Sequence, residues 1–239
     1  MATQYLLLTL LIFGLSTGTH ATELPSSERA QKAIAKVEPA LIKRLAENGL
    51  QYGAPIFIRI FKEPGVLEVW VESHDGTFVH FKDYKICTFS GKLGPKLKTG
   101  DRQSPEGFYF VNPGRLNPWS RFHLSFNLGY PNAYDRFHKR TGSALMVHGN
   151  CVSIGCYAMT DAYINEIYAL ATAALASGQP FFRVHVFPFK LETEILAQHS
   201  RNKWYSFWTN LKEGYDYFNA HKQPPNVGVA NGKYTFNSP

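Results

Sequence analysis

The sequence predicts a mainly β or α+β fold in a single domain, with an N-terminal helical appendage and C-terminal helices. Helical periodicity is found near the two ends of the chain, whereas the middle has short runs of β-branched and aromatic residues separated by turn signals. The chain has 239 residues and 44% hydrophobic content, which is enough to bury one substantial core.

The first residues have the pattern of a secretory signal peptide over residues 1–21. The apolar run 5–15 is too short to span a bilayer, and small residues follow it up to Ala21. No Lys or Arg precedes the run, so an uncleaved anchor stays as the alternative. In either case we expect the rest of the chain to be exported.

The helical appendage is predicted over residues 22–52. Ser26 or Ser27 is a suitable N-cap, and Gly49 is expected to end the helix. Pro39 is expected to split it. One apolar face is formed by Ile34, Val37, Leu41 and Leu45.

Most of the strands are predicted within residues 53–190. The turn signals Pro64-Gly65 and Asp75-Gly76 separate the first runs and favour a β-meander. A long loop over residues 91–107 comes before the later strands. The predicted strands are Ile56–Phe61, Leu67–Val71, Thr77–Phe81, Lys85–Phe89, Phe108–Val111, His123–Leu128, Ala144–His148 and Phe181–Phe187.

Two further helices are expected in the last third of the chain. Thr160 is expected to cap one that ends before Gly178. Within residues 191–239, a Trp- and Tyr-rich helix is predicted over Asn202–Asn219, and the last dozen residues are expected to be a loose tail. In the last predicted strand of the sheet, His185 is expected to be a hydrogen-bonded structural residue.

The net charge of +7 does not point to nucleic acid. The basic residues are spread thinly, and no known reader motif accompanies them. A mild basic bias fits a carboxylate-rich polymer equally well.

The segment 146–161 carries the candidate chemistry. A predicted strand delivers His148, a short loop follows, and Cys156 leads into the helix capped by Thr160. A cysteine attacks as the thiolate, which a neighbouring imidazole or helix N-terminus favours. We therefore predict Cys156 as a nucleophile and His148 as its general base.

Three neighbouring residues are candidates for supporting this site. Gly155 and Gly149 allow backbone amides to approach a substrate closely, as oxyanion donors must. Ser153 is placed to donate a hydrogen bond near the thiolate, although a turn-stabilising role fits it equally well.

The three cysteines leave two alternatives open. His148, Cys151 and Cys156 could supply zinc ligands, although their spacing matches no familiar zinc pattern. A disulfide between Cys87 and Cys151 is compatible with catalysis because it leaves Cys156 free. No cofactor is expected.

Two motifs resemble the L,D-transpeptidase catalytic-domain family, which has the YkuD-like fold. In that family a His-Gly precedes a Ser-x-Gly-Cys, as His148-Gly149 precedes residues 153–156. Upstream, residues 101–109 resemble the family's Thr-Pro-x-Gly-x-Phe segment. The resemblance covers residues 56–187 and makes 53–190 the expected catalytic domain, a β-sandwich.

The resemblance implies an acyl-enzyme formed on Cys156 at meso-diaminopimelate of a peptidoglycan stem peptide, in the periplasm. The short link between His148 and Cys156, with Ile154 in place of a common His, is similar to the YafK-type subgroup. That subgroup implies an amidase, which would release a wall-linked lipoprotein. An inactive wall-binding module is the competing class.

Substrate contacts are expected from three further residues. Arg102 lies in the upstream motif and could hold a substrate carboxylate, whereas a solvated loop arginine is the alternative. Tyr130 and Tyr134 could line the cleft, whereas packing is the alternative for both.

Overall fold

Two five-stranded sheets form the centre of the computed structural model, which describes residues 24–238. The signal segment expected at residues 1–21 lies outside the described residues. Sheet A has the order β3-β2-β1-β10-β5 and comprises β1 (Ile56–Phe61), β2 (Val66–Glu72), β3 (Phe78–Lys85), β5 (Gly107–Val111) and β10 (Phe182–Phe187). Sheet B has the order β4-β9-β8-β7-β6 and comprises β4 (Thr88–Phe89), β6 (Leu116–Asn117), β7 (Ser125–Asn127), β8 (Met146–His148) and β9 (Tyr157–Ala158).

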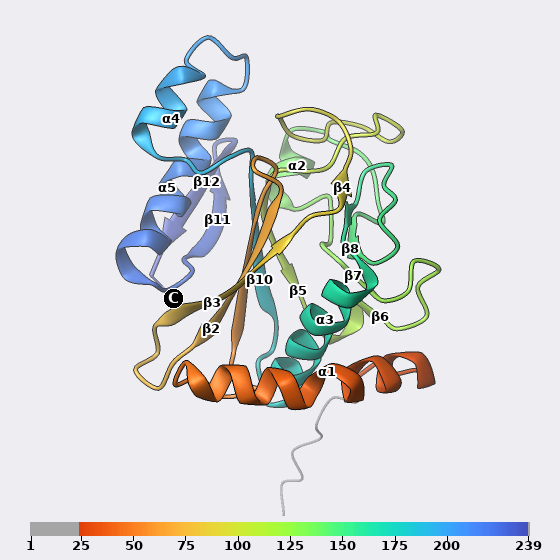
Figure 1. Cartoon of the computed structure of the whole chain (residues 1–239). Coiled ribbons are helices and arrows are strands. Elements are labelled where there is room, and N and C mark those ends of the chain that lie inside the picture. Colours follow the sequence, from red (N-terminus) through yellow and green to blue (C-terminus); the bar gives the residue numbers. More distant parts are fainter. Residues whose placement is uncertain (1–23, 239) are drawn as a thin grey trace, which may run out of the picture.

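The helices surround these sheets, and the fold is the expected α+β class. Helix α1 crosses one end of the molecule beside α3, whereas α4, α5 and a C-terminal hairpin lie on the side of sheet A away from sheet B (Figure 1). None of the helices in residues 24–238 is long and apolar enough to cross a membrane. These elements are α1 (Glu28–Glu47), the 3₁₀ helix η1 (Pro113–Arg115), α2 (Ala133–Phe137), α3 (Asp161–Ala176), α4 (Thr193–Gln198), α5 (Tyr205–His221), β11 (Asn226–Ala230) and β12 (Lys233–Asn237).

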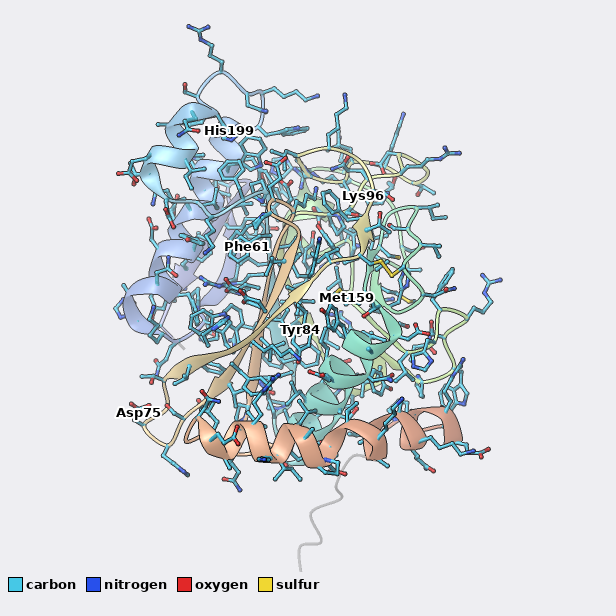
Figure 2. The ribbon with its side chains drawn as sticks, viewed as in Figure 1. Phe61, Asp75, Tyr84, Lys96, Met159 and His199 are labelled. Atoms are coloured by element: carbon cyan, nitrogen blue, oxygen red, sulfur yellow. A yellow bond between two sulfur atoms is a disulfide. The ribbon has the colours of Figure 1, made fainter. Side chains whose placement is uncertain are left out.

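Sheet A is covered on both faces, so its central strand β1 is buried at every position. Ile58 and Ile60 point into a first core shared with sheet B, α1 and α3. Phe61, on the other face, belongs to a second core with α5 and the hairpin. In Figure 2, Tyr84 and Met159 lie in the first core and Phe61 lies towards α5.

The meander predicted for β1, β2 and β3 is confirmed, because these strands pair antiparallel in sequence order. The antiparallel pairing of a meander does not extend across the whole sheet, because β10 pairs parallel with β1, with Ile58 opposite Val184. The long chain segment between β1 and β10 provides the crossover that a parallel pair needs. In β10, the expectation that His185 is hydrogen-bonded is wrong, because neither ring nitrogen has a hydrogen-bond partner within residues 24–238.

Helix α1 begins as predicted, with the Ser27 side chain accepting from the amide of Ala30. The prediction that Pro39 splits it is wrong. Pro39 is exposed, so the carbonyl that loses its helical partner can turn to water, while the buried Leu41 and Leu45 hold the next turns in the core.

The predicted loose tail is in fact the β11–β12 hairpin. Asn231 and Gly232 have φ angles of +50° and +73°, which suit the two central positions of a tight hairpin turn. The hairpin is anchored by Tyr234, which stacks on Tyr134 with 4.2 Å between ring centroids. The C-terminal segment therefore completes the second core.

Candidate active site

Cys156 and His148 lie at neighbouring strands of sheet B. β8 and β9 pair parallel, with Val147 opposite Tyr157, and both of these side chains are fully buried in the first core. Side chains alternate between the two faces of a strand, so His148 and Cys156 share the opposite face. Helix α3, capped by Thr160 as predicted, starts directly after β9 and fixes its end.

His148 is oriented as a neutral base. Its Nδ1 lies 2.6 Å from the carbonyl oxygen of Gly149. A carbonyl can only accept, so Nδ1 carries the proton and the lone pair lies on Nε2. Burial lowers the pKa of His148 below 6.5, and the ring stacks on Phe122 at 4.7 Å. The imidazole is therefore uncharged at neutral pH and able to accept a proton.

The Cys156 thiol is half-buried and protonated at rest. Its Sγ accepts from the amide of Met146 at 3.4 Å and lies 3.7 Å from the carbonyl oxygen of Ala144. Burial raises its pKa, an effect that the Met146 amide and the Lys96 charge oppose. No hydrogen bond within residues 24–238 joins Sγ to His148, so a proton transfer between the two groups would need them to move closer together when a substrate binds.

A disulfide joins Cys87 and Cys151, with 5.2 Å between their Cα atoms. It ties the loop 149–155 to the segment preceding β4. It also excludes the zinc site considered from the sequence, because Cys151 cannot act as a thiolate ligand beside His148. Cys156 keeps a free thiol.

The predicted support residues have internal partners. The Gly155 amide donates to Ser153 Oγ at 3.1 Å, and the Gly149 amide donates to the carbonyl oxygens of Phe122 and Leu124. Neither amide is free to serve as an oxyanion donor in this arrangement. The Ser153 hydroxyl donates to the Cys156 carbonyl at 2.7 Å, so it fixes the backbone of Cys156 and does not contact its sulfur.

Two further serines, Ser90 and Ser104, complete this network and were missed from the sequence. The fully buried Ser104 donates to the Cys156 carbonyl at 3.1 Å and accepts from the Ser90 amide at 3.0 Å. The Ser90 and Ser153 hydroxyls are 2.9 Å apart. Ser104 belongs to the upstream motif, so its position in residues 101–109 was the signal that could have identified it.

Lys96 is a second residue that sequence reasoning missed. Its side chain is 5% exposed and forms an ion pair with Asp101, close enough to Cys156 to affect the thiol electrostatically. The Tyr130 hydroxyl donates to the Lys96 carbonyl at 3.1 Å, so Tyr130 supports this segment from behind. Nothing in the loop 91–107 predicts a buried lysine.

The other two candidate substrate contacts differ in position. Arg102 is exposed, and its neighbour Gln103 packs against Gly155, with 3.7 Å between the Gln103 carbonyl oxygen and a Cβ placed on that glycine. Arg102 thus lies beside the loop 149–155 that leads to Cys156. Tyr134 instead packs on Tyr234 in the second core.

Comparison with known proteins gives consistent matches. Residues 68–186 match the family described as "L,D-transpeptidase catalytic domain". The chain is 46% identical over 187 residues to "Putative L,D-transpeptidase YafK" of Escherichia coli (strain K12), covering 78% of this chain and 76% of that protein. The relative of the same name in Escherichia coli O157:H7 matches equally.

Solved structures give weaker matches. A mutant form of the helical cell shape determining protein Pgp2 from Campylobacter jejuni aligns with a TM-score of 0.46 and 19% identity, covering 79% of this chain and 64% of that chain. Another structure of Pgp2 aligns with a TM-score of 0.42 and 18% identity, covering 79% of this chain and 80% of that one. This chain therefore spans less than two thirds of the first of these structures.

Proposed function

Because the chain belongs to the L,D-transpeptidase catalytic domain family, whose members act on peptidoglycan stem peptides, we propose that it is a cysteine acyltransferase of the bacterial cell wall. Cys156 is the proposed nucleophile and His148 the proposed base. The observation that supports this best is the Nδ1–H bond from His148 to Gly149, because it leaves Nε2 free to accept the thiol proton.

The proposed reaction has two steps. His148 takes the proton of Cys156, and the sulfur attacks the carbonyl carbon at the meso-diaminopimelate centre of the stem peptide. The tetrahedral intermediate collapses to a thioester, and His148 returns the proton to the leaving amine. An acceptor then gives a proton to His148 and attacks the thioester, which releases the product and restores the thiol.

The surroundings of the nucleophile suit a peptide polymer. Ile154 and Val152 are 84% and 50% exposed beside Cys156, which offers apolar contact to a substrate chain. Arg102 is exposed next to the same loop and is the proposed partner of a stem-peptide carboxylate. Hydrogen bonds from Ser104 and Ser153 to the Cys156 carbonyl hold the backbone of the proposed nucleophile in place.

Hydrolysis is the second candidate activity, with a wall-linked lipoprotein as the released partner. It is supported by the short connection 149–155, which the Cys87–Cys151 disulfide holds against the body of the domain. A short, tied loop offers little surface to bind and orient an amine acceptor, which leaves the thioester open to water. In this reading the enzyme is an amidase that uses the same acyl-enzyme.

We also propose that the protein works after export, in the periplasm. A structural disulfide fits an oxidising compartment.

Separate incubations with two substrates test these activities. The protein without residues 1–21 is given tetrapeptide muropeptides or lipoprotein-linked muropeptides, and the products are identified by mass spectrometry. Cross-linked dimers support transfer, and a freed lipoprotein remnant supports hydrolysis. If neither forms and Cys156→Ala binds sacculi as wild type does, the protein is a wall-binding module and the proposal is wrong.

A further inference from the structure

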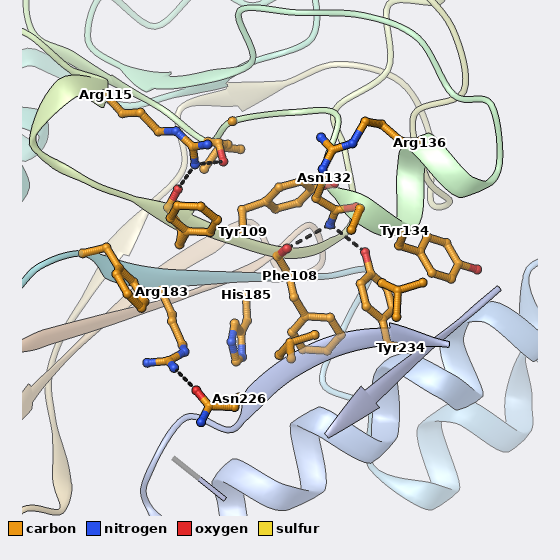
Figure 3. Close-up of a pocket in the computed structure, with 17 residues that line it drawn as sticks. Phe108, Tyr109, Arg115, Asn132, Tyr134, Arg136, Arg183, His185, Asn226 and Tyr234 are labelled. Atoms are coloured by element: carbon orange, nitrogen blue, oxygen red, sulfur yellow. Dashed lines mark hydrogen bonds between the residues drawn. The ribbon is translucent and has the colours of Figure 1, made fainter. Parts of the chain in front are cut away.

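A separate cavity lies at the edge of sheet A, between β5, β10, α2 and the β11–β12 hairpin (Figure 3). Its volume is about 360 Å³, within the range of small-molecule sites. Neither Cys156 nor His148 lines it. We propose that this cavity binds a small organic carboxylate with a flat apolar body.

The positive charge of the cavity wall favours an anionic ligand. Arg115, Arg136 and Arg183 line the cavity, and none of the Asp and Glu residues that the structure describes does. Each guanidinium has five N–H donors, of which only some are used within the protein. Arg183 donates to Asn226 Oδ1 at 2.5 Å, and Arg136 donates to the carbonyl of Pro131. The remaining donors can bind a carboxylate in the forked geometry that arginine favours.

His185 adds an unpaired polar group to the inner wall. The side chain is 1% exposed, yet neither Nδ1 nor Nε2 has a hydrogen-bond partner within residues 24–238. Leaving a buried donor unpaired is costly, so such a group calls for a reason. Figure 3 shows the imidazole between Arg183 and Phe108, on the strand face that the cavity adjoins. A bound carboxylate oxygen would accept from its N–H.

The apolar part of the ligand is indicated by an aromatic pair at the cavity. The rings of Phe110 and Phe181 lie 5.4 Å apart, and Phe110 is 44% exposed. Arg115 stacks over Phe110 at 4.3 Å, and Arg183 over Phe181 at 5.1 Å. Two guanidinium groups thus flank two phenyl rings. The guanidinium groups can bind the acid group of a ligand, and the phenyl rings can pack against a flat ring that carries it.

Calorimetric titration of the protein without residues 1–21 tests this proposal. The probe is 3-phenylpropionate, and the comparison ligands are 3-phenylpropionamide, acetate and inorganic phosphate. We expect the aromatic acid to bind about tenfold more tightly than its amide, which lacks the charge, and than acetate, which lacks the ring. Equal binding of acid and amide, tighter binding of phosphate, or no binding of the acid overturns the proposal.

Variants test whether the cavity is a binding site or only a space that packing leaves unfilled. Arg183→Gln should weaken the acid about tenfold, whereas Arg201→Gln, an exposed arginine that does not line the cavity, should leave it unchanged. His185→Phe should raise the melting temperature, because it removes unpaired polar atoms, and should still weaken binding. If His185→Phe and Arg183→Gln both bind the acid as wild type does, the proposal is wrong.

Discussion

The Ser104 hydroxyl donates a hydrogen bond of 3.1 Å to the carbonyl oxygen of Cys156, and this bond joins two segments far apart in the chain. Ser104 comes from the loop before β5, whereas Cys156 precedes β9. The contact explains why the two motifs recognised in the sequence occur together. The upstream motif holds the backbone of Cys156, which the second motif carries.

Ser104 is therefore predicted to be a positioning residue. Ser104→Ala removes its bond to Cys156 and leaves the partly buried Ser90 amide without this acceptor. We expect kcat to fall about tenfold with little change in KM, and stability to fall by about 1–2 kcal/mol. Steady-state kinetics and thermal unfolding measure both. The exposed Ser206→Ala is the control, and equal kcat in the two variants would refute this role.

The pH dependence of kcat/KM should report His148. Its pKa is lowered by burial, and only the neutral ring can accept a proton, so activity should fall on the acid side below pH 6.5. The unfolded chain protonates this histidine more readily, so the free energy of unfolding should also fall as pH drops below 6.5. A rate profile with its acid limb above pH 6.5 would argue against a buried neutral base.

Alkylation should show that the resting thiol is protonated. Burial raises the pKa of Cys156 above 9.0, so its reaction with iodoacetamide should be slow at pH 7 and should still be accelerating at pH 9.0. The rate is followed by intact mass. A fast reaction that is independent of pH near neutrality would mean a preformed thiolate–imidazolium pair instead.

The disulfide should stabilise the fold and the catalytic loop. Cys87 and Cys151 are separated by 64 residues, for which loop-closure entropy predicts about 4 kcal/mol. The double variant Cys87→Ser, Cys151→Ser should melt at a lower temperature than wild type and lose activity. Added reductant should not lower the melting temperature of this variant further. Wild-type stability in that variant would show that the bridge is dispensable.

The loop before β5 should be stabilised by a buried ion pair and by a hydrogen bond from the C-terminal extension. Lys62 Nζ lies 3.0 Å from Glu106 Oε1, and Trp208 donates to Glu106 Oε2 at 2.8 Å. Lys62→Met would leave a buried carboxylate without its cation, so we expect a loss of about 3–5 kcal/mol in denaturant unfolding. The exposed pair is the control: Lys32→Met, beside Glu28, should cost less than about 1 kcal/mol.

Local signals in the sequence predicted the local structure well. Asp75-Gly76 closes the β2–β3 hairpin, and Thr160 caps α3, because each depends on the few residues around it. Asn231-Gly232 carried the same kind of hairpin signal and was overlooked. Pro39 was misjudged because tertiary packing outweighs a local helix-breaking preference.

Long-range relationships could not be predicted in the same way. Nothing near residues 182–187 shows that β10 inserts between β1 and β5, since that pairing depends on which strands can share one core. In the candidate site, the sequence separation of His148 and Cys156 indicated proximity, whereas the serine network around Ser104 depends on a contact across 52 residues. The unpaired state of His185 depends on its neighbours in space.

The central proposal is an acyl-enzyme on Cys156, and intact-protein mass spectrometry during turnover of a tetrapeptide muropeptide tests it most directly. We expect a transient mass increase equal to the stem peptide minus its leaving residue, located at Cys156 by peptide mapping. The adduct should be absent in Cys156→Ala and slow to form in His148→Ala. Turnover by Cys156→Ala, or an adduct on any other residue, would contradict it.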